Sequence, residues 1–488
     1  MKFSENDLER WKNLFARAAR KSDSLAAESM GLLKNKIDYP SDHQYLEASE
    51  KKLINLIDGR QPAQSDPGDL EHAASRYVLL NLAGKLADLD MISATEGEKI
   101  KDLYNKLSLD KSLITADIWN RIEEKVKETG GIVAGDGSIY GLRKYEQLDP
   151  EWATALFYNL CLKHGIIKKA DFVVQPNKQG IKVDQDVVQI GIVGDWGTGP
   201  YKNADGNQPS TRVMENLAKL DPDYTIHLGD VYYAGTSRSD LIESQEEIDN
   251  LVNVWKPDGD KSLALNSNHE MYSGAHGLFR DALTSGRFSL QQGASYFALV
   301  HDRWVVFGLD SAYYDNSPLF MNGALNDENQ LDFIRGIDTA GKKVIAMTHH
   351  NGLQPDGKKR LPLWEDVNKA LGGRDPDFWY WGHVHNAIAY SDAADAGQTV
   401  ARCIGHGAIP FAKAPGLYHD DGSAAGANNK EIAYYAGQEL PVPKDLMVAL
   451  APNGFAVLTI SGDSLTEIFC DQNGRVVWAP PPHRFRSF

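Results

Sequence analysis

Short apolar runs separated by amphipathic helical patterns dominate the chain after about residue 186. The runs have strand length and are rich in branched and aromatic residues: VVQIGIV, YTIHL, SLALN, WVVFGLD, KVIAM and DFWYW. Helical patterns lie between them, around Val213 and Leu217, over 241–255, and from about Asn326. Strands that alternate with helices in this way predict a layered α/β domain.

The first part of the chain has a purely helical pattern. Leu8, Trp11 and Phe15 recur at the spacing of one helix face, and similar patterns continue as far as residue 170. No His, Asp or Cys cluster at metal-ligand spacing interrupts them. We therefore predict an all-α N-terminal domain over 1–170, which acts as a scaffold or binds a protein partner.

Two further boundaries follow from composition. Residues 171–186 are polar and broken by Pro176 and Gly180, which is typical of a connector or an entering hairpin. We predict that the second domain covers 187–488 and closes with a β-meander. Within it, 414–440 is rich in Ala, Gly, Asn and Tyr and predicts a loop insertion.

Length, cysteine content and charge narrow the class of protein. A chain of 488 residues exceeds one ordinary domain, and its three dispersed cysteines favour neither a disulfide framework nor a thiolate metal cluster. The net charge of -16 would repel nucleic acid. The charged N-terminus has no signal-like apolar segment, and no run is long enough to span a membrane. We expect a cytoplasmic protein, or one exported without a cleaved signal.

Five short polar motifs each come directly after an apolar run. They are GDWGTG from Gly194, GDVYYAG from Gly229, NSNHE from Asn266, THH from Thr348 and GHVHN from Gly382. Any one of them is compatible with an ordinary turn, since Asp, Asn and Gly favour turns. Five in this order are expected at the carboxyl ends of strands, where α/β sheets build their sites.

The residue types in these motifs suit two neighbouring metal ions. Two ions about 3.5 to 4 Å apart can both activate a nucleophile and neutralise charge on a phosphoryl group. Asp195 and Asp230 supply carboxylates, one of which can bridge the ions, and Asn268 supplies a neutral amide oxygen. His383 and His385 are separated by one residue, so a bend between them can direct one imidazole to each ion.

Other histidines have different expected roles. His269 follows Asn268 directly and is placed to reach substrate, which suits a general acid toward the leaving group. His350 and His406 are candidates for substrate contact, although an ordinary loop histidine is the alternative for His406. His227 lies inside the YTIHL strand and is expected to be buried structure.

These motifs resemble those of the calcineurin-like metallophosphoesterases over about residues 187–480. Within that superfamily they look like the purple acid phosphatases. Gly197 stands where the common first motif has His, and Tyr233 comes three residues after Asp230. GDWGTG and GHVHNAIAY are especially similar to the mammalian-type members. Ser267 departs from the pattern, because that position is usually Gly.

The resemblance implies an α/β/β/α sandwich and a ligand set. It assigns Asp195, Asp230, Tyr233 and His385 to the first metal, and Asp230, Asn268, His349 and His383 to the second. The implied ions are Fe(III) with Fe(II), Zn or Mn, and a hydroxide that they hold would attack phosphorus in line.

The sequence thus predicts an acid-phosphatase-like enzyme that hydrolyses small-molecule phosphomonoesters. Two alternatives stay open. One is a phosphodiesterase on cyclic nucleotides or phospholipid-type diesters, since the same metal pair can cleave diesters. The other is a partner-binding or effector protein whose helical domain recognises a partner and whose metal domain is vestigial.

Overall fold

A computed structural model of the chain describes residues 167–202, 206–238, 240, 244–409, 417, 429–437 and 452–484, with isolated positions before 167. The isolated positions include a two-stranded antiparallel ribbon, β1 (Ile132–Val133) and β2 (Ile139–Tyr140). The predicted all-α domain over 1–170 therefore lies almost wholly outside the described residues. None of the described helices has the length and apolar character needed to cross a membrane.

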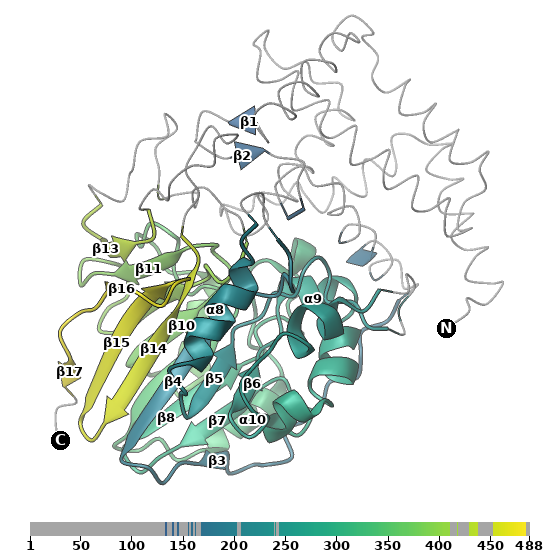
Figure 1. Cartoon of the computed structure of the whole chain (residues 1–488). Helices are drawn as coiled ribbons and strands as arrows, with labels where there is room; N and C mark the ends of the chain where they lie inside the picture. The colour runs from purple at the N-terminus through teal and green to yellow at the C-terminus, as the bar shows by residue number, and fades with distance from the viewer. Residues whose placement is uncertain are drawn as a thin grey trace, which may run out of the picture.

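Two mixed sheets form the centre of the described part of the chain (Figure 1). The larger has eight strands in the order β13-β11-β12-β10-β9-β8-β7-β3. Their bounds are β3 Ile181–Lys182, β7 Phe297–Val300, β8 Trp304–Leu309, β9 Lys343–Thr348, β10 Phe378–Trp381, β11 Ala387–Tyr390, β12 Val400–Ile404 and β13 Ile432–Tyr435. The pairs β8–β9, β9–β10 and β10–β12 are parallel.

The second sheet has the order β16-β15-β14-β4-β5-β6, with β17 paired to β15. Its strands are β4 Val187–Val193, β5 Tyr224–His227, β6 Ser262–Ala264, β14 Gly454–Ser461, β15 Ser464–Asp471, β16 Val476–Trp478 and β17 His483–Arg484. β4, β5 and β6 are parallel, and β14 joins β4 antiparallel. The predicted meander is confirmed as β14, β15 and β16.

The sheets pack face to face with helices on both outer faces. In β8, Trp304 and Val306 point into the core between the sheets, whereas Val305 and Phe307 point to the outer face. A strand that is buried on both faces has apolar residues at consecutive positions, which explains the continuous apolar sequence of β8. The four layers confirm the expected α/β/β/α arrangement.

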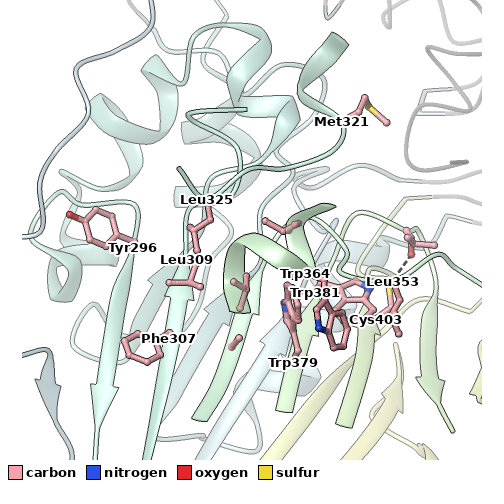
Figure 2. Packing of buried hydrophobic residues seen from close by; sticks show 14 of the residues in the cluster. Tyr296, Phe307, Leu309, Met321, Leu325, Leu353, Trp364, Trp379, Trp381 and Cys403 are labelled. Atoms are coloured by element: carbon pink, nitrogen blue, oxygen red, sulfur yellow. Dashed lines mark hydrogen bonds between the residues drawn. The ribbon is translucent and has the colours of Figure 1, made fainter. Parts of the chain in front are cut away.

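Helices cover each outer face with apolar residues. α8 (Pro209–Ala218) lies along β4 and β14, as Figure 1 shows. α10 (Glu328–Gly336) and α11 (Pro362–Ala370) cover the larger sheet. Figure 2 shows Trp364 of α11 beside Trp379 and Trp381 of β10, with ring centroids of Trp364 and Trp379 5.0 Å apart. The shorter elements are η1 Glu247–Val252, α9 Asn268–Tyr272, η2 Gly277–Ala282, η3 Gly286–Gln291 and η4 Pro318–Phe320.

The structure adds detail to three of the predicted segments. The helix expected over 241–255 is a π-helix over only Glu247–Val252, among the residues described there. The predicted connector contributes β3, which pairs parallel with β7 at the sheet edge and forms no hairpin. Within the predicted insertion 414–440, Ile432–Tyr435 form β13, which pairs antiparallel with β11. Its Ile and two Tyr residues are of the types that favour strands. Most of the remaining insertion lies outside the described residues.

His227 is fully buried in β5, as its sequence context predicted. Its ring lies edge-on to Trp196 and Trp255, and neither ring nitrogen finds a hydrogen-bond partner among the described residues. Burial lowers the pKa of His227 to about 3. The native protein therefore keeps this ring neutral and bears the cost of two unpaired polar atoms.

We expect His227→Leu to stabilise the fold by about 1 to 3 kcal/mol, because Leu removes the unpaired nitrogens at similar volume. Below about pH 6.5 the unfolded wild type binds a proton at His227, whereas the native ring stays neutral. The free energy of unfolding of wild type therefore decreases as the pH is lowered below about 6.5. The gain should therefore be larger at pH 5 than at pH 7 in denaturant unfolding. His301→Leu is the control, since His301 accepts a bond from the Arg303 N–H; an equal gain there would contradict the argument.

Candidate metal centre

The five motifs meet where the carboxyl ends of the two sheets come together. Asp195 follows β4, Asp230 follows β5 and Asn268 follows β6 in the smaller sheet. His349 follows β9, and His383 and His385 follow β10 in the larger one. All six side chains are buried, and the most exposed, His385, is only 5 % accessible. The predicted position of the motifs at strand ends is confirmed.

Three of these residues have a backbone that side chains normally avoid. Asp195, Asp230 and His383 have φ values of 55°, 77° and 67°. Positive φ costs energy in residues with a side chain, and such residues gather at functional sites. The loops after β4, β5 and β10 therefore turn sharply and direct these side chains back over the strand ends.

One donor cluster contains Asp195, Asp230 and His385, whose ligand atoms lie within 4.8 Å of one another. His385 Nε2 is 3.4 Å from Asp195 Oδ1 and 3.9 Å from Asp230 Oδ2. The His383 backbone N–H donates to both Asp195 oxygens, at 3.1 and 3.0 Å. Two carboxylates and an imidazole form a donor set that suits a transition-metal ion.

A second cluster surrounds His349. Its Nδ1 lies 3.0 Å from the Leu228 carbonyl oxygen and must donate there, which leaves a lone pair on Nε2. That Nε2 faces Asn268 Oδ1 at 2.7 Å and His383 Nδ1 at 3.0 Å. Asn268 Nδ2 donates to the Tyr272 hydroxyl, which fixes the amide orientation and turns Oδ1 toward His349.

This second arrangement fits a cation. A lone pair on nitrogen and an amide oxygen at 2.7 Å repel each other unless a positive ion lies between or beside them. Ligand atoms bind such an ion at about 2.0 to 2.2 Å, so neighbouring ligands lie about 3 Å apart, as they do here. Burial lowers the pKa of His349 to about 3, which keeps its imidazole neutral and able to bind metal.

Asp230 lies between the two clusters. Its Oδ1 is 3.3 Å from His349 Nε2, and its Oδ2 is 3.9 Å from His385 Nε2. One carboxylate thus presents an oxygen to each cluster, which is the arrangement expected of a bridging ligand.

His350 lies beside the second cluster, with its ring centroid 4.7 Å from that of His383. Both of its nitrogens are engaged, because Nε2 is 2.7 Å from the Phe320 carbonyl oxygen and Nδ1 is 2.8 Å from Ser311 Oγ. His349, His350 and His383 all offer ligand atoms within 4.8 Å of one another, but of the adjacent His349 and His350 it is His349 whose Nε2 faces Asn268 and His383.

The two tyrosines after Asp230 contact different neighbours. The Tyr232 hydroxyl donates to Asp230 Oδ2 at 3.0 Å and lies 3.1 Å from His385 Nε2. The Tyr233 hydroxyl instead accepts from the Tyr145 backbone N–H at 3.2 Å, and its ring stacks on Tyr145. The phenol beside the first cluster therefore belongs to Tyr232, because the two side chains leave the loop in different directions.

His269 and His406 are placed differently relative to the clusters. His269 Nδ1 donates to the Tyr233 carbonyl at 2.7 Å, and its Nε2 is 3.8 Å from Asp230 Oδ2. His406 Nε2 instead lies against Gly454 at the start of β14, where a Cβ would approach it to 2.7 Å. The structure brings His269 to the centre, whereas the substrate contact predicted for His406 stays a prediction.

Comparison with known proteins agrees with this geometry. Residues 188–387 match the family model described as Calcineurin-like phosphoesterase. The chain contains a calcineurin-like phosphoesterase domain. No curated protein matches the chain.

Three solved structures are similar to this phosphoesterase domain at low identity. GAP50, the anchor in the inner membrane complex of Plasmodium, is 11% identical, with a TM-score of 0.42 over 62% of this chain and 89% of its own. PhoD is 10% identical, with a TM-score of 0.37 over 62% and 69%. The calcineurin-like phosphoesterase YfkN from Bacillus subtilis is 13% identical, with a TM-score of 0.31 over 61% and 91%.

Two supporting residues of the phosphoesterase domain were not predicted. Asp310 follows β8 and accepts hydrogen bonds from Asn266 Nδ2 and Ser295 Oγ, so it holds the loop that carries Asn268. Its neighbour Ser311 bonds His350. The signal for Asp310 was present, because it ends the WVVFGLD run as the ligands end theirs.

Ser267 links the phosphoesterase centre to a buried acid. Its hydroxyl accepts from the His269 N–H at 3.0 Å, lies 2.5 Å from Asp230 Oδ1 and also contacts Glu270 Oε2. One hydroxyl hydrogen cannot serve two carboxylates. Burial, followed by the charge of Asp230, raises the pKa of Glu270 to about 8, so a protonated Glu270 can donate to Ser267 at neutral pH.

We expect Ser267→Ala to lower the affinity for metal about 10- to 100-fold, because it removes a partner that orients Asp230. It should also cost about 0.5 to 2 kcal/mol of stability as the lost cap of α9. Competition with a chelator and thermal unfolding measure the two effects. Ser285→Ala is the control, since Ser285 caps η3 in the same way away from the centre; an equal loss of metal affinity there would contradict the role of Ser267.

A surface hollow of about 730 Å³ lies elsewhere on the phosphoesterase domain. Lys343, Arg374 and Asp377 line it at the amino ends of β9 and β10. It is therefore at the opposite ends of the strands from the candidate metal centre, and two of its cationic groups, Lys343 and Arg374, are already paired with Asp377.

Proposed function

We propose that this domain is a dinuclear metal-dependent phosphoesterase that hydrolyses small-molecule phosphomonoesters. The observation that carries the proposal is the position of Asp230, whose two oxygens face two separate donor clusters. Two ions held there would supply a nucleophile and neutralise charge on the phosphoryl oxygens.

The ligand assignment follows the donor atoms. Asp195, Asp230 Oδ2 and His385 would hold the first ion. Asp230 Oδ1, Asn268 Oδ1, His349 Nε2 and His383 would hold the second. Iron, zinc and manganese are all compatible with carboxylate, imidazole and amide ligands, and we propose Fe(III) in the first position with Fe(II), Zn or Mn in the second.

Gly197 supports the acid-phosphatase-like form of this proposal. A Cβ at Gly197 would come within 2.6 Å of both the Asp230 carbonyl oxygen and Val231 Cα. No side chain can leave the first motif at that position, so an additional ligand for the first ion must come from another segment. The tyrosine hydroxyl beside Asp230 and His385 offers one.

His269 is the proposed general acid. Its Nδ1 hydrogen is committed to the Tyr233 carbonyl, so Nε2 is the atom turned toward Asp230 and the centre. A proton on Nε2 would pass to the departing alkoxide or phenoxide as the ester bond breaks.

Metal analysis of unsupplemented protein, together with hydrolysis assays, tests this function. We expect two metal ions per chain and faster hydrolysis of an aryl phosphate than of its bis-aryl diester. Faster cleavage of the diester would favour the phosphodiesterase alternative. Two bound ions with no hydrolysis of either ester would favour a binding or effector role.

A further inference from the structure

The segment after Asp230 presents one of two adjacent tyrosines to the first donor cluster. From the geometry of that segment we propose that Tyr232, and not Tyr233, binds the first metal ion through its phenolate oxygen. The inference rests on the proposed metal-dependent function, because it adds a ligand to the same centre. On binding, the phenolic hydrogen would leave to solvent and the oxygen lone pair would go to the ion.

The Tyr232 hydroxyl has the spacing of a ligand. It lies 3.0 Å from Asp230 Oδ2 and 3.1 Å from His385 Nε2. Ligand atoms that bind one ion at about 2.0 to 2.2 Å lie about 3 Å apart, so the three atoms can share an ion without moving far. The Tyr232 side chain is fully buried, and its ring packs edge-on against His269, with centroids 4.6 Å apart.

Contacts on both sides of the loop fix this choice of tyrosine. Asn250 Nδ2 donates to the Tyr232 carbonyl at 2.7 Å. The Glu246 carboxylate accepts the backbone N–H groups of Tyr233 and Ala234, at 2.8 and 2.9 Å. These bonds fix the backbone on both sides of Tyr233 and therefore fix the directions in which the Tyr232 and Tyr233 side chains point.

Tyr145 holds the second tyrosine away from the cluster. Its backbone N–H donates to the Tyr233 hydroxyl, and the two rings stack with centroids 4.8 Å apart. Its own hydroxyl donates to the Thr198 carbonyl in the first motif. Tyr145, which lies outside the matched family segment, thus binds the Tyr233 side chain away from the first cluster, and Tyr232 is the tyrosine that faces this cluster.

Visible absorption of the iron-loaded full chain tests the assignment. A phenolate bound to ferric iron gives a broad charge-transfer band, whereas aspartate and histidine ligands alone do not. We expect the band in wild type and in Tyr233→Phe after addition of ferric iron, and its loss in Tyr232→Phe. Each variant removes one oxygen and keeps the ring, which makes the pair a matched comparison.

Several results would overturn the assignment: no band in wild type, a band that survives in Tyr232→Phe, or a band lost in Tyr233→Phe. Circular dichroism checks that each variant folds. If Tyr232→Phe does not fold, the band in Tyr233→Phe still tests the assignment. Phosphomonoester hydrolysis by wild type is measured in parallel. If the bands are as expected but wild type hydrolyses no phosphomonoester, the proposed function is rejected and the Tyr232 assignment is kept. If wild type hydrolyses the ester but the band survives in Tyr232→Phe, the Tyr232 assignment is rejected and the proposed function is kept.

Discussion

Asp230→Asn is expected to abolish hydrolysis and to weaken binding of both metal ions by more than about 100-fold each. Even the outer partners of metal ligands are worth about 10- to 100-fold in affinity, and Asp230 would bind both ions directly. Asn keeps the size of the side chain and tolerates positive φ, so the loop at φ 77° should still form. The substitution therefore removes charge without removing the turn.

Metal content after dialysis and chelator competition measure the effect on each ion. Asp221→Asn is a matched control, because Asp221 also has positive φ, at 44°, yet lies on the surface with its side chain 83% exposed. The control should keep both ions and full activity. If Asp230→Asn retained two ions at wild-type affinity, Asp230 would not be the bridging ligand.

His269→Gln is expected to lower kcat about 100- to 10,000-fold for esters with poor leaving groups, the usual contribution of a general acid. Esters with good leaving groups depart without a proton, so their rates should fall much less. Metal content should stay unchanged, since His269 Nε2 lies 3.8 Å from Asp230 and Nδ1 is bound to a backbone carbonyl.

A series of aryl and alkyl phosphates measures this dependence on the leaving group. His276→Gln is the control, because His276 lies nearby in the chain but bonds the Lys168 carbonyl. An equal loss for good and poor leaving groups in His269→Gln, or loss of a metal ion, would assign His269 to positioning or ligation and not to proton transfer.

The five motifs could be found from sequence because each follows an apolar strand. The run before His383 is buried at all four positions and reads as a continuous apolar run. The run before Asp195 alternates Val and Ile with Gln189 and Gly191, which is also a strand pattern. Helix and loop boundaries were less predictable. η1 is a π-helix, and β13 forms only because β11 offers it an edge, and such long-range pairing leaves little trace in local sequence.

The sequence by itself determined the donor types, their order and their placement at strand ends, because these depend on local chemistry and on the strands they follow. Only the tertiary structure decided which donors meet, since Asp230 and His349 come from different sheets and face each other through packing. The same holds for the tyrosine. Spacing along the chain cannot distinguish Tyr232 from Tyr233, whereas Glu246, Asn250 and Tyr145 hold the loop so that Tyr232 faces the centre.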